Sequence, residues 1–256
     1  MLVALTREVS PAIGRCELTH LPRVPIDAAV AAVQHRAYRS ALADLGCEVV
    51  VLPAEAGFPD SVFIEDTAVV VDEVAVVLRP GAASRQGETP AVATALAEYR
   101  EIAMIGAPGS VDGGDVLRIG RTLYVGCAEA GRSNATGIAQ LEAALAPFDY
   151  RVQAVPVRGC LHLKSAVTQV ATATLLINRE WVDAGAFAHV AYVDVHPGEP
   201  RAANALLVGG AVIYPASHPR TAERLAKRGI VVRTVDVSEL EKAEGAVTCC
   251  SVIFEA

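Results

Sequence analysis

Hydrophobic and polar positions recur in a fixed order along the chain, most clearly between residues 66 and 108. Two short β-branched segments, DTAVVV and VAVVL, lie on either side of Asp72 and Glu73. Such a pair of runs around a polar turn is typical of a β-hairpin. Thr89 and Pro90 then predict the start of a helix, with Thr89 as its N-cap and Pro90 at the first helical position. The segment EIAMIG that follows is predicted as a third strand.

The same order of strand, strand, helix and strand returns in later segments. It recurs in DVLRIGRTLYVG, GIAQLEAALA and YRVQAVPV, begins again in SAVTQVATATLLIN, and returns in ANALLVGGAVIYP, TAERLAKRG and IVVRTVDV. A helix predicted over residues 27–45, ended by Gly46 and followed by the strand EVVVLP, belongs to a fifth copy. The hairpin of this copy must pair CSVIF, near the end of the sequence, with MLVALT at its start.

Five repeats divide the 256 residues into units of about 51 residues each, a period typical of repeat folds. We therefore predict one domain over residues 1–256, an α/β ring of five pseudo-symmetric modules whose first module is closed by both chain ends. No Ser/Gly-rich linker or charge run divides the chain. An ordinary α/β sandwich with coincidental spacing is the alternative.

A ring of this kind brings together the residues that precede each inner strand, because these strands begin at equivalent ends near the axis. In the sequence these positions carry carboxylates, an amide, a histidine and a cysteine. The residues at this shared position are Asp60, Glu65 and Asp66; Asp112 and Asp115; His162; Asn204; and Cys249. The pattern therefore predicts one site, assembled from distant segments, on the axis of the ring.

Composition and charge narrow the class of protein. The chain is 52% hydrophobic and 20% charged, enough for a sizeable core, and its formal net charge of −7 argues against binding to a nucleic-acid backbone. It has no apolar run fit to span a bilayer, and its first residues, MLVALTREVSP, do not resemble a signal peptide. We therefore expect a cytoplasmic protein that contacts neither membrane nor nucleic acid. None of the six cysteines form a C-x-x-C pair, which argues against zinc ribbons and thioredoxin-type sites.

Cys249 and His162 are the candidate reactive pair. A nucleophilic thiol needs a general acid/base nearby, and His162 is the only one of the six histidines at the repeat position that Cys249 also occupies. A histidine between leucines is more often a core residue, which is the structural alternative. Asp112 can orient the imidazole or hold the substrate, and the two glycines after it allow close backbone approach. Cys250 falls on the other face of its strand and is expected to be structural.

The acidic positions suggest what the reactive pair acts on. Carboxylates gathered in a buried place need a cation, and a guanidinium offers a permanent charge and several N–H donors in one plane. A solvated acidic turn is the alternative for such a cluster. Arginines that suit a substrate carboxylate follow three of the hairpins at similar spacing; they are Arg85, Arg132 and Arg220. Carboxylates, arginines and a thiol together describe a zwitterionic guanidino amino acid as substrate.

With these residues in place, the chain resembles the dimethylarginine dimethylaminohydrolases, a family of the guanidino-group-modifying, or pentein, superfamily. The matching segments run from about residue 58 to 252. They are FPDSVFIEDTAVV, RPGAASRQGET, VDGGDVL, GRSN, LHLK, ANALL with YPASHPRT, and EGAVTCCSV. LHLK alone is a weak signal, whereas the ordered set is highly specific.

The resemblance implies a five-bladed α/β propeller of ββαβ modules and a hydrolase that converts dimethylarginine, and also monomethylarginine, to citrulline and the methylated amine. It implies Cys249 as the nucleophile that forms a covalent thiouronium, His162 as the general acid/base and Asp112 as the third catalytic carboxylate. It implies neither a metal nor an organic cofactor. The substrate-binding residues that it implies are Asp60, Glu65, Asp66, Arg85, Arg132 and, through its backbone on a mobile N-terminal loop, Leu18. The chain departs from some relatives in having Asp112 in place of Glu, and GRSN in place of Arg-Thr-Asn.

Other members of the superfamily are alternatives. Arginine deiminases, amidinotransferases and other small guanidine hydrolases use the same residue types, although the first two are usually longer. A non-catalytic, ribosome-binding member predicts loss of the thiol and histidine and fits poorly with a net charge of −7. A redox sensor built on Cys249 and Cys250 is a further alternative, although adjacent cysteines form a disulfide only with strain. The outer helix AAVAAVQHRAYRSAL can pair two copies into a homodimer.

Overall fold

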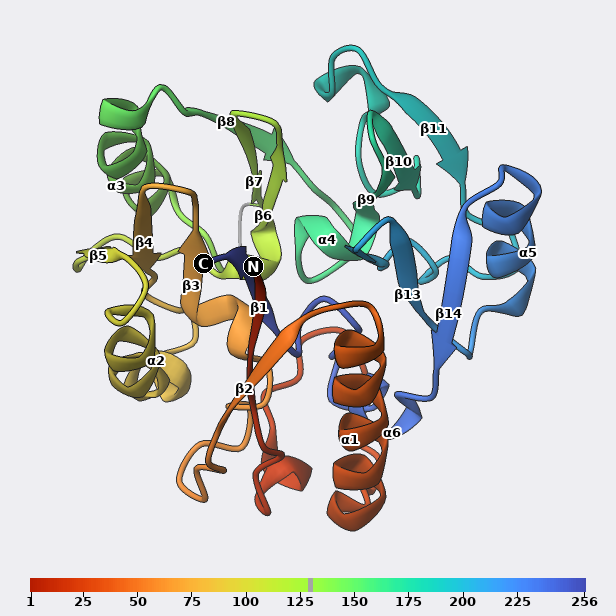
Figure 1. Ribbon diagram of the computed structural model, residues 1–256, viewed down its shortest axis with the longest axis horizontal. Helices are drawn as coiled ribbons and strands as arrows, with labels where there is room; N and C mark the ends of the chain where they lie inside the picture. Colours follow the sequence, from red (N-terminus) through yellow and green to blue (C-terminus); the bar gives the residue numbers. More distant parts are fainter. Residues whose placement is uncertain (129–130) are drawn as a thin grey trace.

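The strands of the computed structural model, which describes residues 1–128 and 131–256, form five separate three-stranded sheets. The sheets are arranged around a common axis, as the view in Figure 1 shows. In every sheet the inner strand is antiparallel to the middle strand, which is parallel to the outer strand. The five-module ring predicted from the repeats is therefore confirmed.

Each module contributes one strand to each of three concentric positions. The inner strands are β3 (Ala68–Val70), β6 (Val116–Ile119), β9 (Val167–Ala171), β12 (Leu206–Val208) and β15 (Val252–Glu255). The middle strands are β1 (Leu2–Arg7), β4 (Val74–Val77), β7 (Thr122–Cys127), β10 (Thr174–Ile177) and β13 (Ala211–Pro215). The outer strands are β2 (Glu48–Leu52), β5 (Glu101–Met104), β8 (Arg151–Pro156), β11 (Ala191–Asp194) and β14 (Val231–Val235).

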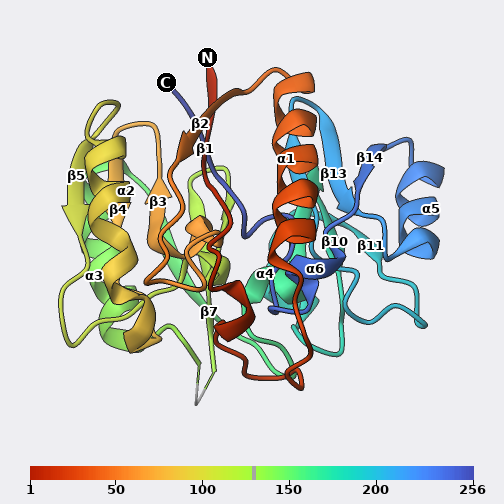
Figure 2. The same ribbon diagram turned by 90° about the horizontal axis from the view of Figure 1, so that it is seen from below.

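The first module joins the two ends of the chain. Strand β15 pairs with β1 from Leu2 opposite Glu255 to Leu5 opposite Val252. Figure 2 shows the two termini side by side at one edge of the molecule. The strand pairing predicted between CSVIF and MLVALT is therefore confirmed.

Four modules cross from the middle to the outer strand through a longer helix. These helices are α1 (Ala28–Asp44), α2 (Thr89–Leu96), α3 (Ala135–Leu145) and α5 (Pro219–Lys227). Asp27 caps α1 by accepting the N–H groups of Ala29 and Val30, and Gly46 follows the helix with a φ of 93°. Because glycine adopts a positive φ without a steric cost, the predicted end of this helix is correct.

Two local expectations were wrong. Thr89 does not cap α2, because the 3-10 helix Ala83–Glu88 leads directly into it and the Thr89 hydroxyl donates to the carbonyl of Gln86. The fourth module has, among its described residues, no helix between β10 and β11 beyond the 3-10 turn Ala184–Ala186. Asp183 forms this turn by accepting the Gly185 N–H, so the crossover is short and carries no helix of its own.

Apolar side chains are buried between neighbouring modules rather than in one central core. One cluster joins Val3 and Leu5 of β1 to Ile64, Leu96 and Phe254. The polar residues of the repeat position lie where the inner strands begin, and, farther along, the inner strands line a cavity with both polar and apolar residues.

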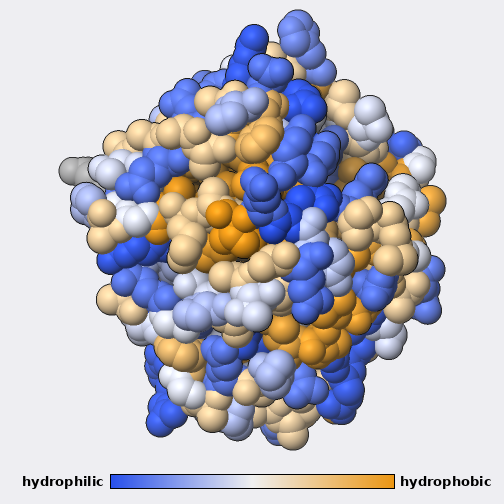
Figure 3. All heavy atoms as spheres, turned by 60° about the vertical axis from the view of Figure 1, so that its left-hand side comes forward, coloured by the Kyte–Doolittle hydropathy of each residue, from blue (hydrophilic) through white to orange (hydrophobic). Residues whose placement is uncertain are grey.

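The surface mixes hydrophilic and hydrophobic residues, and the face in Figure 3 carries several separate hydrophobic patches. The exposed large apolar residues include Val30 and Val33 on α1, and Val51, Met104 and Val231 on outer strands β2, β5 and β14. No helix within the described part of the chain is both long and apolar enough to cross a membrane.

Candidate active site

A one-turn helical segment precedes three of the inner strands and brings polar groups to the axis. These segments are the 3-10 helices Ile64–Thr67 and Gly113–Asp115 and the short helix α4 (Leu163–Ala166). The sequence pattern did not predict these turns, because each is too short to show a helical period. They explain how residues at the same repeat position reach one another across the ring.

A closed circuit of hydrogen bonds links all five modules at this level. Asp66 accepts the Gly114 N–H at 2.8 Å, and Asp115 accepts the Leu163 N–H at 3.0 Å. Asn204 then donates to the carbonyl of Lys164 at 3.1 Å. The circuit closes through two further bonds, from Thr248 N–H to Asn204 Oδ1 and from Glu65 N–H to the carbonyl of Cys249, both at 3.1 Å.

This circuit assigns a structural role to several polar residues of the repeat. Asp115 and Asn204 each satisfy a backbone N–H of the next module, which would otherwise be buried without a partner. Neither residue lines the catalytic cavity described below. The shared repeat position therefore marks the site, but not every residue at that position acts in it.

The candidate catalytic residues line one small cavity at an end of the axis, with a volume of about 30 Å³. Its walls come from four modules and from the segment that follows β1. They are Glu17, Asp60, Phe63, Asp66, Arg85, Asp112, Arg132, Leu161, His162, Ala243, Glu244, Gly245 and Cys249. All three predicted catalytic residues are thus together, with four of the predicted substrate-binding residues.

His162 is buried and bonded to Asp112, with 3.0 Å between its Nε2 and Asp112 Oδ2. Asp112 is itself held, because its Oδ1 accepts the Gly81 N–H at 2.7 Å. Burial alone lowers the pKa of the imidazole, but the carboxylates of Asp66, Asp112 and Asp115 raise it to about 9. At neutral pH His162 therefore carries a proton that it can donate.

The glycines of VDGGD permit this close packing. A Cβ on Gly114 would lie 2.5 Å from Nδ1 of His162, and one on Gly113 would lie 1.9 Å from the carbonyl oxygen of Glu65. Both contacts are too short for any side chain, so the close backbone approach predicted for these glycines is confirmed.

Ser133, in the segment GRSN, forms hydrogen bonds with both Asp112 and Asp115. Its hydroxyl donates to Asp115 at 2.6 Å and accepts the Asp112 N–H at 3.2 Å. Asn134 caps α3 by accepting the Gly137 N–H. A threonine offers the same hydroxyl, which explains why the departure from Arg-Thr-Asn is a mild one.

Cys249 has a free thiol that is partly buried and lines the same cavity. Burial raises its pKa above the usual value, and the carboxylates of Glu65 and Asp66 raise it further. The thiol is therefore protonated at neutral pH. A cation placed beside it would lower its pKa again, which makes the site selective for a positively charged partner.

Arg85 is largely engaged by the protein. Its Nη1 donates to Asp66 at 2.6 Å, its Nε and Nη2 donate to both oxygens of Glu88, and Nη2 also donates to the Phe63 carbonyl at 2.9 Å. A guanidinium has five N–H groups, so one on Nη1 is left for a ligand.

The two carboxylate partners of Arg85 differ in how far the sequence indicated them. Burial alone would raise the pKa of Asp66, but His162 and Arg85 lower it. Glu88, three residues after Arg85, was not predicted, because its i,i+3 spacing is common on any helical surface.

Glu65 lies behind the catalytic cavity rather than in its wall. Its Oε1 accepts from Nζ of Lys164 at 2.6 Å and its Oε2 from the Thr248 hydroxyl at 2.9 Å. Burial raises the pKa of Glu65 even with Lys164 beside it. These three residues also line a second cavity of about 280 Å³ between the inner strands, so they separate it from the catalytic one. Neither Lys164 nor Thr248 was predicted.

We expect Lys164→Met to lower the free energy of unfolding by about 3 kcal/mol, because removing one partner of a buried pair leaves the other charge uncompensated. Lys164 and Glu65 have side-chain exposures of 18% and 9%, so solvent compensates little. Urea unfolding at pH 7 measures the loss. The double variant Lys164→Met, Glu65→Gln should recover part of it, and equal stability of the single variant and the parent would contradict the ion pair.

The segment after β1 closes the cavity from outside. Asp60 accepts the Glu17 N–H at 3.1 and 3.2 Å through its two oxygens, and Arg132 donates to the Thr19 hydroxyl at 2.9 Å. Leu18 lies between these contacts, and its carbonyl makes no hydrogen bond with the described residues. Arg220, the third predicted arginine, does not reach the cavity; it lies in the first turn of α5, with its N–H bonded to Glu199.

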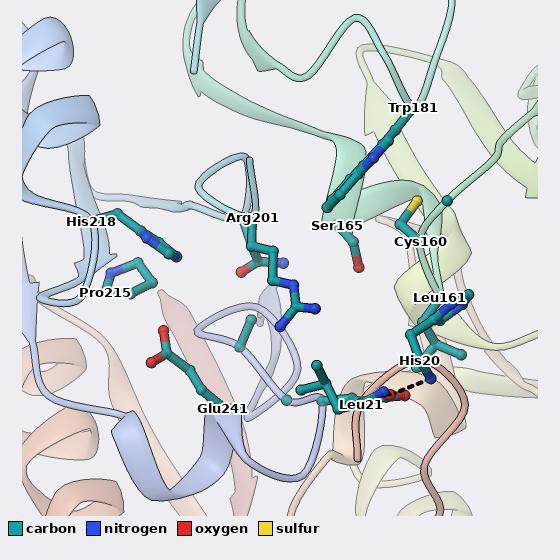
Figure 4. A pocket seen from close by; sticks show the side chains of 15 residues that line it. His20, Leu21, Cys160, Leu161, Ser165, Trp181, Arg201, Pro215, His218 and Glu241 are labelled. Atoms are coloured by element: carbon teal, nitrogen blue, oxygen red, sulfur yellow. Dashed lines mark hydrogen bonds between the residues drawn. The ribbon is translucent and has the colours of Figure 1, made fainter. Parts of the chain in front are cut away.

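A larger cavity of about 250 Å³ lies beside the catalytic one (Figure 4). Arg201 projects toward its middle, with Trp181 on one side and His218 on the other. Leu161, Glu244 and Gly245 belong to the walls of both cavities. The larger cavity therefore adjoins the catalytic cavity on the side formed by these three residues.

Asp66, Asp112 and His162 are close enough to one another to hold a metal ion, within 4.8 Å among their ligand atoms. The surrounding groups do not suit one. His162 Nε2 already bonds Asp112, and Asp66 accepts from the permanently charged guanidinium of Arg85 at 2.6 Å. His162, whose pKa is raised to about 9, is protonated at neutral pH and has no lone pair for a metal, whereas the carboxylates can still accept the N–H groups of an organic cation.

A partly buried thiol, a protonated histidine and carboxylates on the axis of five ββαβ-type modules define the guanidino-group-modifying class of α/β propellers, the pentein superfamily. Known proteins agree. The chain is 42% identical to a dimethylarginine dimethylaminohydrolase of Streptomyces coelicolor, over 97% of this chain and 95% of that one. It is 36% identical to the Pseudomonas aeruginosa protein of the same name, over 89% and 90%. The chain belongs to the dimethylarginine dimethylaminohydrolase family.

Solved structures give the same assignment. The Pseudomonas aeruginosa protein, as a Cys-to-Ser variant complexed with citrulline, superposes with a TM-score of 0.93 at 33% identity, over 98% of both chains. A His-to-Gly variant of a dimethylarginine dimethylaminohydrolase, in an adduct with S-methyl-L-thiocitrulline, also gives 0.93 at 33% identity, over 99% of this chain and all of the other. No protein-family model matches the sequence.

Proposed function

We propose that the protein hydrolyses Nω,Nω-dimethyl-L-arginine to L-citrulline and dimethylamine, with residues 1–256 acting as one catalytic unit, and that it accepts monomethylarginine in the same way. The observation that carries the proposal is the meeting of Cys249, His162 and Asp112 in one cavity rich in carboxylates. The family relationship supports the same reaction. The homodimer and the cytoplasmic location expected from the sequence stay predictions.

The cavity offers a partner for each charge of the substrate. The guanidinium lies beside Asp66 and Asp112, where the carboxylates stabilise its positive charge. The α-carboxylate of the substrate pairs with Arg132 and with the remaining N–H of Arg85. The α-ammonium pairs with Asp60 and with the unbonded carbonyl of Leu18. Glu65 acts from behind the cavity, where its negative charge favours a cation at Cys249.

The first half of the reaction removes dimethylamine. The bound guanidinium lowers the pKa of Cys249, whose proton leaves to solvent, and the thiolate attacks the central carbon. A C–S bond forms, and the C–N bond to the dimethylamino group breaks. His162 gives its proton to that nitrogen, because an amine anion is too basic to leave alone. The product on the enzyme is a cationic S-alkylthiouronium.

The second half restores the enzyme. Neutral His162 takes a proton from water as the oxygen attacks the thiouronium carbon. The C–S bond then breaks, the leaving sulfur of Cys249 takes up the proton of the new hydroxyl group and becomes a thiol, and L-citrulline is released. Asp112 stabilises the imidazolium in both steps and fixes the ring through its bond to Nε2.

Product identification tests the proposal. Incubation with Nω,Nω-dimethyl-L-arginine should give citrulline and dimethylamine in equal amounts, with no dependence on an added amine acceptor. Transfer of the amidino group to an acceptor would instead indicate an amidinotransferase. Absence of both products, in protein whose Cys249 reacts with iodoacetamide, would exclude dimethylarginine as substrate.

A further inference from the structure

The segment Glu17–Leu21 covers the catalytic cavity in which the proposed substrate has to fit. Glu17 is part of the wall of the catalytic cavity, whose volume of about 30 Å³ has room for only about two water molecules. An arginine derivative is several times larger. Opening of the segment would provide the missing room, and an anchor would then have to return the segment over the bound substrate.

Two side chains that hold the segment Glu17–Leu21 are also proposed to bind the substrate. Asp60 accepts the Glu17 N–H and Arg132 donates to the Thr19 hydroxyl, and both side chains are proposed to bind the substrate ends. Substrate binding therefore competes with these contacts. An anchor that serves the closed, occupied state has to lie elsewhere.

Glu244 supplies such an anchor. Its carboxylate accepts three consecutive backbone N–H groups, from Thr19 at 3.0 Å and from His20 and Leu21. A carboxylate that accepts several N–H groups forms strong, charge-assisted bonds. None of these bonds uses a group that the proposed function assigns to the substrate.

The backbone holds Glu244 in a set position. Its φ is 58°, in the left-handed region, which is unfavourable for a residue other than glycine. The backbone of the next residue packs closely against Phe63, because a Cβ on Gly245 would lie 2.1 Å from the Phe63 ring. The strained turn lies only five residues before Cys249, so the segment and the nucleophile are held by one piece of chain.

We propose that Glu244 is a positioning residue, which holds Glu17–Leu21 closed over the catalytic cavity while substrate occupies it. It acts through the segment and through the Leu18 carbonyl that the segment carries, rather than on the reacting atoms. This inference rests on the proposed function, and it adds a residue that neither the sequence pattern nor the resemblance indicated.

The test compares Glu244→Gly and Glu244→Gln with Glu241→Gln as the matched control. Glu241 lies three residues earlier and bonds the Ser217 hydroxyl instead of the segment. In Glu244→Gly we expect the KM for dimethylarginine to rise about tenfold, since strong hydrogen bonds to the closed state are lost, with kcat changed less than about threefold. Glu244→Gln keeps one acceptor oxygen and should show a smaller rise. Glu241→Gln should leave both constants unchanged.

Two further measurements separate positioning from a purely structural role. Alkylation of Cys249 by iodoacetamide without substrate should be about tenfold faster in Glu244→Gly, because the segment opens more often. The melting temperature should change little, because glycine relieves the strain at a φ of 58°. Alkylation needs no turnover, so it tests Glu244 even if the protein acts on another substrate. Unchanged alkylation and unchanged KM, or a loss of stability alone, would overturn the proposal.

Discussion

Cys249→Ser should lower citrulline release from dimethylarginine by at least about 10³-fold, since a hydroxyl forms no nucleophilic anion at neutral pH and the covalent route is lost. The carboxylates around the cavity are unchanged in this variant, so dimethylarginine should still bind. Steady-state turnover measures the first effect, and isothermal titration measures the second. Loss of binding along with turnover would point to misfolding instead.

Cys250→Ala is the matched control for this variant. Cys250 is the adjacent residue, is fully buried, and contacts the carbonyl of Ala246 rather than the cavity. We expect it to keep kcat within about threefold and to lose only about 1 kcal/mol of stability, from a small void in the core. Retained activity in Cys249→Ser, or a loss of activity in Cys250→Ala as large as that expected for Cys249→Ser, would contradict the assignment of the nucleophile.

His162→Gln should lower kcat for dimethylarginine by about 10²- to 10⁴-fold, the range typical of a lost general acid/base. The protein holds His162 protonated with a pKa of about 9, so the loss should be present across neutral pH. The amide can still bond Asp112 but has no proton of suitable acidity to give to the departing amine. Measurement of kcat from pH 6 to pH 9 in both proteins checks the expectation.

A substrate with a better leaving group tests the role of His162 more sharply. Methanethiolate leaves without a proton, so S-methyl-L-thiocitrulline should form the Cys249 adduct in His162→Gln. Because water attack then lacks its base, the adduct should accumulate and be visible in the mass of the intact protein. An adduct with this compound is known for a His-to-Gly variant of a family member. If neither dimethylarginine nor S-methyl-L-thiocitrulline reacted with His162→Gln, His162 would have a role beyond proton transfer.

The ring could be predicted from the sequence because its repeats are long and their hairpins are strongly β-branched. The pairing of β1 with β15 followed from counting modules, since the fifth module lacked a hairpin of its own. The crossover at Ala184–Ala186 could not be predicted as short, because a repeat argument assigns each module the same elements. The apolar residues of that crossover pack into the core without a helix.

The site was predicted in its location more completely than in its detail. The repeat position correctly brought Cys249 and His162 together, but it did not distinguish cavity residues from those that only close the hydrogen-bond circuit, such as Asn204. Partners like Glu88 and Lys164 were missed because ion pairs across a ring leave no local spacing in sequence. Glu244 was missed for the same reason, since its partners are more than 220 residues away.

A competition in one tube tests the central claim most directly. Nω,Nω-dimethyl-L-arginine and L-arginine are supplied at equal concentration, and dimethylamine and ammonia are measured together, so their ratio gives the ratio of the two kcat/KM values. The site described here, with the sequence family that it belongs to, predicts dimethylamine as the dominant product and citrulline equal to the sum of both amines. Ammonia as the dominant product would contradict it and make the protein an arginine deiminase.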